Sequence, residues 1–231
     1  MKVQTEFDDL HPFVKLVKAR LEQSADPGKA VQMQAYMKTS QPFYGVQAAE
    51  RKKQISEIKK QHPLSSFDEY QTIILQLWQS PHREEMYQAL EVAERFRQFR
   101  TPEAMPLYEY LIETANNWDT LDWIATKLVG DLVLKHPELE SFLITWREHS
   151  SFWVRRAALL AQLKHKKDTN LQLLADSITA LMHEKEFFIQ KAIGWVLREL
   201  AKTNPDWVSM FVNQHEAQLS GLSKREALKY V

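Results

Sequence analysis

Apolar residues recur at intervals of three and four along almost the whole chain, which is the spacing of one face of an α-helix. The first such stretch follows Pro12 and carries Phe13, Leu16, Val17 and Leu21. Later stretches are separated by short segments rich in proline, glycine and helix-capping residues. The sequence contains no Asn-Gly or Asp-Gly dipeptide, which is the strongest short-range hairpin signal. The pattern therefore predicts an all-α protein.

The turn signals divide the chain into about a dozen helices of ordinary length. The expected helices span residues 12–25, 27–39, 48–61, 65–80, 82–99, 101–115, 118–135, 137–149, 152–166, 169–184, 187–203 and 205–218, followed by a short helix from 223. The connections between them are short, so consecutive helices are expected to pack antiparallel.

Proline-containing turns repeat at similar intervals along the chain. Pro63, Pro102 and Pro137 are spaced by 39 and 35 residues, and Pro205 follows 68 residues later. A period in the thirties with two helices per unit is typical of an α-solenoid, whose concave face collects one helix from each unit. We expect one solenoid domain over residues 1–231, with a flexible segment at 1–9 and the functional residues on the concave face.

Composition excludes several classes of protein. Hydrophobic residues make up 44% and charged residues 26% of the 231, which is ordinary for a folded domain. The 30 basic and 30 acidic residues cancel, so no bulk charge favours nucleic acid or membrane. Cysteine is absent, in keeping with a reducing cytoplasm, and no uncharged stretch reaches the length of a membrane span. The N-terminus lacks the apolar core of a signal peptide. A cytoplasmic protein is expected.

The segment Asn116–Trp123 ends one expected helix and begins the next. Trp118 and Asp122 are four residues apart, so a helix places the indole and the carboxylate on the same face. Two interpretations are open. Asp119 could cap the helix and Asp122 could be solvated in its first turn, with the tryptophans in the core. Alternatively, the pair forms a functional site, because a carboxylate beside an aromatic plane is costly unless something compensates it.

Two further segments concentrate positive charge despite the neutral total. Lys191, Trp195, Arg198 and Lys202 follow one another at steps of four, three and four, which makes one cationic stripe on a helix. Residues 151–167 hold five basic and no acidic residues, namely Arg155, Arg156, Lys164, Lys166 and Lys167. Each could be a solvated face or a polyanion site. The tryptophan within the stripe favours partial burial.

If equivalent helices of successive units line one surface, then Trp118, Asp122, Arg156 and Trp195 converge there. Such a group could bind a sugar-phosphate backbone and stabilise positive charge on the sugar. The histidines form neither His-x-x-x-His nor His-Glu-x-x-His, so neither a metal nor another cofactor is expected. No second carboxylate is placed to complete the acid and base pair of ordinary glycosidases.

These residues resemble the AlkD-like DNA glycosylases of the DNA alkylation repair family, which are built of HEAT-like helical repeats. The resemblance runs from His11 to the segment 222–227 and is most specific in the stretch 186–199 around Trp195. The other matching segments are 36–38, 45–47, 77–78, 118–122, 135–139 and 153–158. Two departures are Asn117, where the family often has a second tryptophan, and Ala49, where it often has proline.

The resemblance implies a monofunctional enzyme that hydrolyses the N-glycosidic bond of N3- and N7-alkylated purines in double-stranded DNA, in base excision repair. It implies that Asp122 is the catalytic carboxylate, that Trp118 and Trp195 contact the lesion nucleotide, and that Arg156 holds the DNA backbone. It also places Tyr36 against DNA. The further DNA contacts that we expect are Arg155, Lys164, Lys191, Arg198 and Lys202. A monomer is expected.

An alkylated purine already carries positive charge, so it leaves as a neutral base and needs no protonation. One ionised carboxylate, Asp122, then suffices to stabilise the oxocarbenium character of the deoxyribose and to orient water. Two alternatives remain: a repeat-protein scaffold that binds a protein partner, and a DNA-binding relative without catalysis. Steep loss of affinity with salt would favour DNA over a protein partner.

Overall fold

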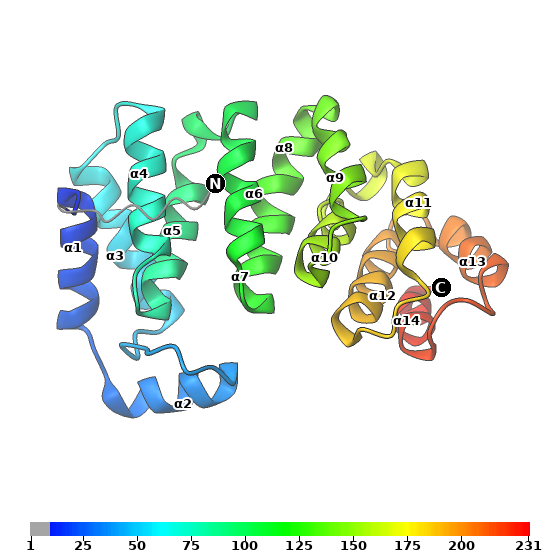
Figure 1. Ribbon diagram of the computed structural model, residues 1–231, viewed down its shortest axis with the longest axis horizontal. Coiled ribbons are helices and arrows are strands. Elements are labelled where there is room, and N and C mark those ends of the chain that lie inside the picture. Colours follow the sequence, from blue (N-terminus) through cyan, green and yellow to red (C-terminus); the bar gives the residue numbers. More distant parts are fainter. Residues whose placement is uncertain (1–9) are drawn as a thin grey trace. The chain divides into compact units, whose positions relative to one another are not determined.

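The computed structural model describes residues 10–231, and these residues are helical with no β-strand among them (Figure 1). The all-α prediction is therefore confirmed. Two compact units divide the chain, residues 1–100 and residues 101–231. The single domain expected from the sequence stays a prediction, and the flexible segment expected at 1–9 lies outside the described residues.

Most of the expected helices are present with boundaries within a few residues. Unit 1 contains α1 (Pro12–Gln23), α2 (Pro27–Met37), α3 (Ala48–Gln61), α4 (Phe67–Trp78), α5 (Arg83–Arg95) and the 3-10 turn η1 (Arg97–Phe99). The helices of unit 2 are α6 (Met105–Thr114), α7 (Trp118–Trp123), α8 (Gly130–Lys135), α9 (Glu140–Trp146), α10 (Phe152–Leu160), α11 (Leu171–Leu181), α12 (Phe187–Ala201), α13 (Pro205–Gln214) and α14 (Gly221–Ala227). Its shorter turns are η2 (Pro102–Ala104), η3 (Ile124–Val129), η4 (Pro137–Leu139), η5 (Lys166–Asp168) and η6 (Leu228–Tyr230).

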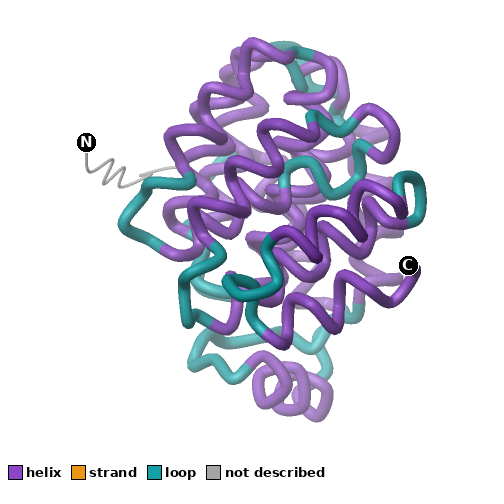
Figure 2. Tube along the Cα trace, turned by 90° about the vertical axis from the view of Figure 1, so that its right-hand side faces the viewer, coloured by secondary structure: helices purple, strands orange, loops and turns teal. Residues whose placement is uncertain are grey.

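In unit 1, α4 packs against α5, and α1 contacts α3, α4 and α5. The helix α2 lies across the ends of these helices, and Figure 2 shows it end-on below them. Asp26 caps α2 by accepting a hydrogen bond from the amide of Lys29 at 3.1 Å, as the Asp-Pro signal predicts. A small apolar cluster of Met37, Phe43 and Tyr87 holds the end of α2 to α5.

A buried carboxylate organises the loop between α2 and α3. Glu84 of α5 is fully buried and accepts hydrogen bonds from three successive backbone amides, those of Tyr44, Gly45 and Val46, at 3.0, 2.8 and 3.1 Å. Gly45 has a φ of 89°, and a Cβ there would lie 2.0 Å from the carbonyl oxygen of Asp26. Only glycine fits this turn, which fixes where α2 is attached.

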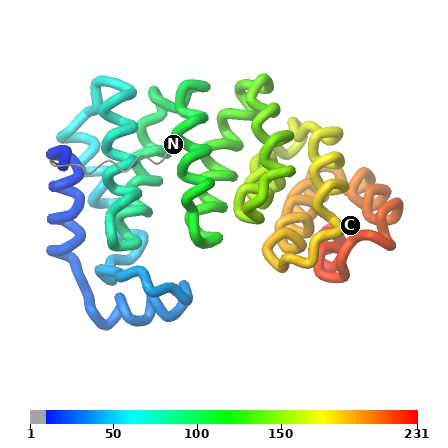
Figure 3. The backbone as a smooth tube through the Cα atoms, viewed as in Figure 1, coloured from blue at the N-terminus to red at the C-terminus, as the bar shows by residue number. Residues whose placement is uncertain are grey.

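In unit 2, α10 occupies the centre. It contacts α6, α7 and the turn Ile124–Val129, and also α9, α11 and α12. Beyond it, α12 packs most extensively against α14 and also contacts α13 (Figure 3). Side chains that α10 presents are therefore held from several directions, which makes it the element best placed to fix a site.

The helix expected over 118–135 forms, but it is not one uniform α-helix. Between α7 and α8 the turn Ile124–Val129 is π-helical, and the amide of Gly130 bonds to the carbonyl of Ala125, five residues earlier. Such turns occur mostly as single turns within α-helices and frequently lie at functional sites. The sequence-based expectation did not include this turn.

Several expected helices end earlier than predicted. The helix 152–166 ends at Leu160 and continues only as turns, and the helix 82–99 ends at Arg95. The helix at 118 is capped by Asn117, whose side-chain oxygen accepts a hydrogen bond from the amide of Trp118 at 2.8 Å, and not by Asp119. Hydrophobic periodicity continues through such tight turns, so it overestimates helix length.

Candidate functional site

The helix α7 presents the predicted indole and carboxylate. Trp118 is 37% exposed, and the side chain of Asp122 is 13% exposed. Their spacing of four residues on α7 puts them on one side of the helix. Thr120 and Leu121, between them in sequence, are fully buried and fix the orientation of the helix. Asp122 is therefore neither a solvated first-turn carboxylate nor a core residue.

Asp122 forms a two-pronged ion pair with Arg156. The guanidinium Nε lies 2.8 Å from Oδ1 of Asp122, and Nη2 lies 2.9 Å from Oδ2. Nη1 of the same guanidinium donates to the backbone carbonyl of Phe188 on α12. The side chain of Arg156 is only 4% exposed. Two predicted site residues, 34 positions apart in sequence, are thus in direct contact, and planar pairing of this kind holds both groups in one geometry.

Burial and pairing act on the carboxyl of Asp122 in opposite directions. Loss of water raises its pKa above the usual 3.8, and the nearby charge of Asp119 adds to this. The hydrogen bonds and the positive charge of Arg156 lower the same pKa. A guanidinium stays protonated at all ordinary pH values, so it favours the charged form of its partner. Burial is the largest of these influences, so the pKa of Asp122 lies above its usual value, although Arg156 favours the charged form.

One aromatic ring, Phe188, lies beside the guanidinium of Arg156, and further rings pack against Phe188. Its carbon lies 5.7 Å from the ring centre of Phe188, a cation-π distance. The ring of Phe188 stacks on Phe152 at 6.1 Å and contacts Trp153 at 4.8 Å. Phe187, beside it, is 56% exposed. These four rings lie at the starts of α10 and α12 and were not among the predicted site residues. Sequence alone does not show which phenylalanines are exposed, so it gave no signal for them.

Trp195 is half-buried on α12 and lies seven residues after Phe188. Seven residues are close to two helical turns, so both side chains leave α12 on nearly the same side. Trp195 is therefore on the same side of α12 as the ring that covers Arg156. Its contact with a substrate stays a prediction.

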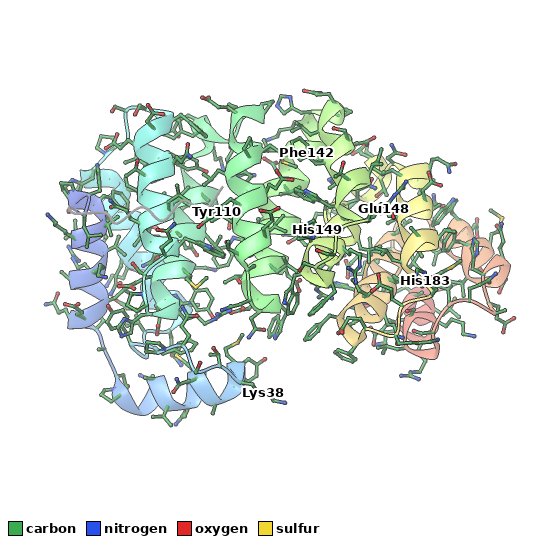
Figure 4. The ribbon with its side chains drawn as sticks, viewed as in Figure 1. Lys38, Tyr110, Phe142, Glu148, His149 and His183 are labelled. Carbon is green, nitrogen blue, oxygen red and sulfur yellow. The ribbon has the colours of Figure 1, made fainter. Side chains whose placement is uncertain are left out.

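Arg155 has a structural partner. Its Nε and Nη2 bond to the two carboxylate oxygens of Glu184 at 2.7 and 2.9 Å. Its Nη1 donates to the backbone carbonyls of His149 and Ser150 at 2.6 and 2.8 Å. Figure 4 labels His149 in this loop before α10. Arg155 thus ties that loop to the segment before α12, and its expected contact with DNA stays a prediction.

The predicted cationic stripe of α12 is largely compensated within unit 2. Glu226 of α14 bonds to Lys191 at 3.1 Å, to Lys229 at 3.0 Å and to Arg198. Lys202 pairs with Glu199 at 2.7 Å. Hydrogen bonds from Lys229 and Lys191 lower the pKa of Glu226 from 4.5 to about 2. The stripe thus forms one side of the contact between α12 and α14. The spacing of residues along α12 cannot reveal a partner on another helix.

The two remaining predicted DNA contacts lie at exposed positions. Lys164 is exposed in the turn that follows α10. Tyr36 is 74% exposed on α2 in unit 1. Lys38, labelled in Figure 4, follows in a left-handed conformation with a φ of 49° and ends that helix. Contact of Lys164 or Tyr36 with DNA stays a prediction.

The described residues hold no group of three or more histidine, cysteine, aspartate or glutamate side chains that could bind a metal ion. Over the same part of the chain, the helices are too short or too polar to span a bilayer.

Comparisons with known proteins agree with this all-helical arrangement. A family model described as DNA alkylation repair enzyme matches residues 17–231. The chain belongs to the DNA alkylation repair enzyme family. Among solved structures, one described as a predicted DNA alkylation repair enzyme from Enterococcus faecalis is 33% identical, with a TM-score of 0.83 over 90% of this chain and 96% of that chain. A comparison with curated proteins gave no match.

Proposed function

We propose that this member of the alkylation repair family is a DNA glycosylase that releases cationic N3- and N7-alkylpurines from double-stranded DNA. The observation that carries the proposal is the poorly solvated carboxylate of Asp122, held by both oxygens to Arg156 at 2.8 and 2.9 Å. A carboxylate at a DNA-binding surface repels phosphate, so binding alone gives it no use. Stabilising a cationic sugar gives it one.

In the proposed reaction the bond between the sugar carbon C1′ and the base nitrogen breaks. Its electron pair moves to the base, which cancels the positive charge of the alkylated ring, and the purine leaves neutral. The sugar gains oxocarbenium character, which the ionised Asp122 stabilises. Water then adds to C1′ and transfers its proton to Asp122 or to solvent.

Arg156 supports this role by keeping Asp122 ionised and fixed in direction. Both carboxylate oxygens are bonded to the guanidinium, whose Nη1 is anchored on the carbonyl of Phe188. Trp118, which is partly exposed beside Asp122, and Trp195 are proposed to contact the lesion nucleotide. An indole face also attracts the positive charge of the base.

Selectivity follows from the charge of the lesion. A neutral base would have to leave as an anion, and that step needs an acid. The lone Asp122, held ionised by Arg156, does not supply a proton. Many glycosylases rotate the base into a pocket. The proposed reaction needs only a glycosidic bond that the positive charge of the base has already weakened, and the negative charge of Asp122.

The test is release of free base from methylated duplex DNA under single-turnover conditions, with Asp122→Asn as the variant. Removing one preorganised electrostatic group costs about 10²- to 10³-fold in other enzymes, so the rate should fall by at least that factor while DNA affinity is kept. Equal rates for the two proteins, or no base release by the wild type, would contradict the proposal.

A repeat-protein scaffold is the second candidate, because partly exposed aromatic residues such as Trp118 and Phe187 are typical of protein interfaces. The dependence of binding on salt concentration distinguishes the two candidates better than the ion pair between Asp122 and Arg156 does. Binding to DNA should weaken steeply as salt rises, whereas an apolar protein interface should respond weakly.

A further inference from the structure

The helix that carries Asp122 has an unusual repeat of buried residues. Its fully or almost fully buried pairs are Thr120 with Leu121, Ile124 with Ala125, Leu128 with Val129, and Leu132 with Val133. Each pair follows the previous one after four residues. An ideal α-helix turns about 100° per residue, so a step of four overshoots a full turn by about 40°. Over three steps the buried face would rotate by about 120°.

A uniform α-helix could not bury all of these pairs against one side of unit 2. If Leu132 and Val133 kept their places, Thr120 and Leu121 would turn out of the core, and Asp122 would turn with them. The π-helical turn at Ile124–Val129 removes the conflict. One extra residue in a turn moves the preceding stretch back by about 100°, which nearly cancels the accumulated rotation.

Two contacts hold the end of this turn against the segment that carries Arg156. A Cβ on Gly130 would lie 2.4 Å from the carbonyl oxygen of Ala161, just after α10, so the two backbones approach to a distance that only glycine allows. The Nε2 of His165 bonds to the carbonyl of Gly130 at 2.8 Å. His165 is 5% exposed, and burial lowers its pKa, so the neutral ring donates this bond.

A third contact lies within the turn itself. The hydroxyl of Thr126 donates a hydrogen bond of 2.7 Å to the backbone carbonyl of Asp122. Thr126 is 8% exposed and is thus nearly closed to solvent. A π-helical turn changes which backbone amide can reach the carbonyl of Asp122. The hydroxyl of Thr126 bonds to that carbonyl and so holds the main chain of the carboxylate residue.

We propose that the π-helical turn Ile124–Val129 aims Asp122 at Arg156, and that Thr126, Gly130 and His165 are positioning residues that hold this turn. The inference rests on the proposed function for its consequence in catalysis, and on the geometry alone for its effect on the ion pair. The two segments meet at two places, Asp122 with Arg156 and Gly130 with His165. Both contacts must form in the same folded structure.

The substitution Thr126→Val removes the hydroxyl at nearly constant volume. We expect base release under single-turnover conditions to fall by about tenfold or more, because small misplacement of a catalytic group is costly, with DNA affinity within about twofold of the wild type. Thr126→Ser, which restores the hydroxyl, should recover most of the rate. A variant that only loosened the fold would change affinity and rate together.

A matched control is available in the same unit. The hydroxyl of Thr145 on α9 makes the same kind of bond, to the carbonyl of Ser141 four residues earlier at 3.1 Å, at an exposed position. Thr145→Val should leave base release unchanged. If Thr126→Val does not fold, the pair His165→Leu and His165→Gln replaces it, since glutamine can still donate to the carbonyl of Gly130.

A second readout does not depend on activity. The carboxyl of Asp122 can be titrated by carbon-13 NMR in wild type and Thr126→Val. Burial is the largest influence and raises its pKa, Arg156 lowers it, and Asp119 on its own helix raises it. Thr120 and Leu121 keep this helix buried, so the contact with Arg156 is the influence that the variant changes. If the turn aims Asp122, the variant weakens the contact with Arg156 and the pKa of Asp122 rises.

The outcomes separate this inference from the proposed function. Active wild type with equal rates for wild type and Thr126→Val, or an unchanged pKa of Asp122, overturns the inference and leaves the proposed function standing. Absence of base release by the wild type overturns the proposed function, while a raised pKa of Asp122 in Thr126→Val still supports the positioning role. A slower variant with a raised pKa supports both.

Discussion

Pairing with Arg156 favours the charged form of Asp122, and burial leaves its carboxylate poorly hydrated. Charge and hydration together determine how strongly this carboxylate can interact with a cation. A carboxylate in water is already surrounded by dipoles and gains little from a cationic sugar nearby. With its side chain 13% exposed, Asp122 meets less of this competition. Burial raises the pKa of Asp122, and the hydrogen bonds and positive charge of Arg156 oppose this rise. The pair therefore keeps a usable negative charge.

Arg156 is the residue for which the structure and the family resemblance suggest different roles. The resemblance implies that it holds the DNA backbone, whereas the structure shows it holding Asp122 and the carbonyl of Phe188. Lysine cannot reproduce a two-pronged contact. We expect Arg156→Lys to lower the rate of base release at saturating protein by about tenfold or more, as loss of a preorganised group does, with a small change in DNA affinity.

Fluorescence anisotropy for affinity and single-turnover kinetics for rate separate the two roles of Arg156. Lys164→Ala is the control, because this exposed lysine lies in the turn after α10 and should affect affinity alone. A large loss of affinity in Arg156→Lys with an unchanged rate would show that Arg156 serves DNA binding and not the positioning of Asp122.

The residues of the site differ in how far sequence could predict them. The spacing of Trp118 and Asp122 places them on one helix face, and the structure agrees. The partner of Asp122 was predicted only as a neighbour, because a contact across 34 residues depends on packing and not on spacing. Glu184, which binds Arg155, carries no local signal that marks it as a partner.

At the scale of elements, α12 and α14 form a contact in which a carboxylate gathers cations. Glu226 bonds to Lys191, Lys229 and Arg198, and a Cβ on Gly194 would lie 2.6 Å from the Cβ of Glu226. The glycine lets the helices approach, and the approach brings the charges together. Charge periodicity along α12 predicted the stripe but not its partner, since the partner comes from another helix.

Glu226 gives this contact a measurable dependence on pH. Its pKa is about 2 in the folded chain and has an ordinary value of 4.5. The folded state therefore binds fewer protons between these values, so the stabilisation is present above pH 4.5 and is lost as pH falls toward 2. Glu226→Gln should lower the midpoint of thermal unfolding at pH 7 by roughly 2–4 °C, the shift that about 1 kcal/mol gives at this size.

The same thermal unfolding measurement near pH 3 checks the cause. The difference between wild type and Glu226→Gln should be smaller there than at pH 7. Glu113→Gln, at an exposed carboxylate on α6, is the control and should change neither midpoint. A difference that is the same at both pH values would show that Glu226 stabilises through packing and not through charge.

Helix type was predicted better than helix detail. The boundaries of α3 agree with the expectation, because its caps and turns are local signals. The π-helical turn between α7 and α8 was missed, although its signal is in the sequence as buried pairs that repeat every four residues from Thr120 to Val133. A search for periods of three and four treats that repeat as an ordinary helix.

At the scale of the whole molecule, charge is balanced, with 30 basic and 30 acidic residues. DNA binding must then rest on local groups and not on an overall attraction. We expect affinity for methylated duplex to fall by more than about tenfold between 50 and 200 mM salt, as release of counterions from a few phosphates requires. Fluorescence anisotropy at several salt concentrations measures this slope.

Two variants help to interpret the salt dependence. Lys164→Ala should reduce the slope by about one phosphate contact, whereas Lys15→Ala, at an exposed lysine of α1 outside the predicted contacts, should leave it unchanged. A flat salt dependence would favour the protein-partner alternative and would remove the basis for treating Asp122 as a residue that meets DNA.

Release of a cationic alkylpurine compared with release of uracil, from otherwise identical duplexes and under single-turnover conditions, tests the central claim most directly. If the carboxylate of Asp122 acts on a base that is already charged, the alkylpurine should be released at a measurable rate and uracil more than about 10²-fold more slowly, a difference of the size of one preorganised charge. Equal rates for the two bases would contradict the account.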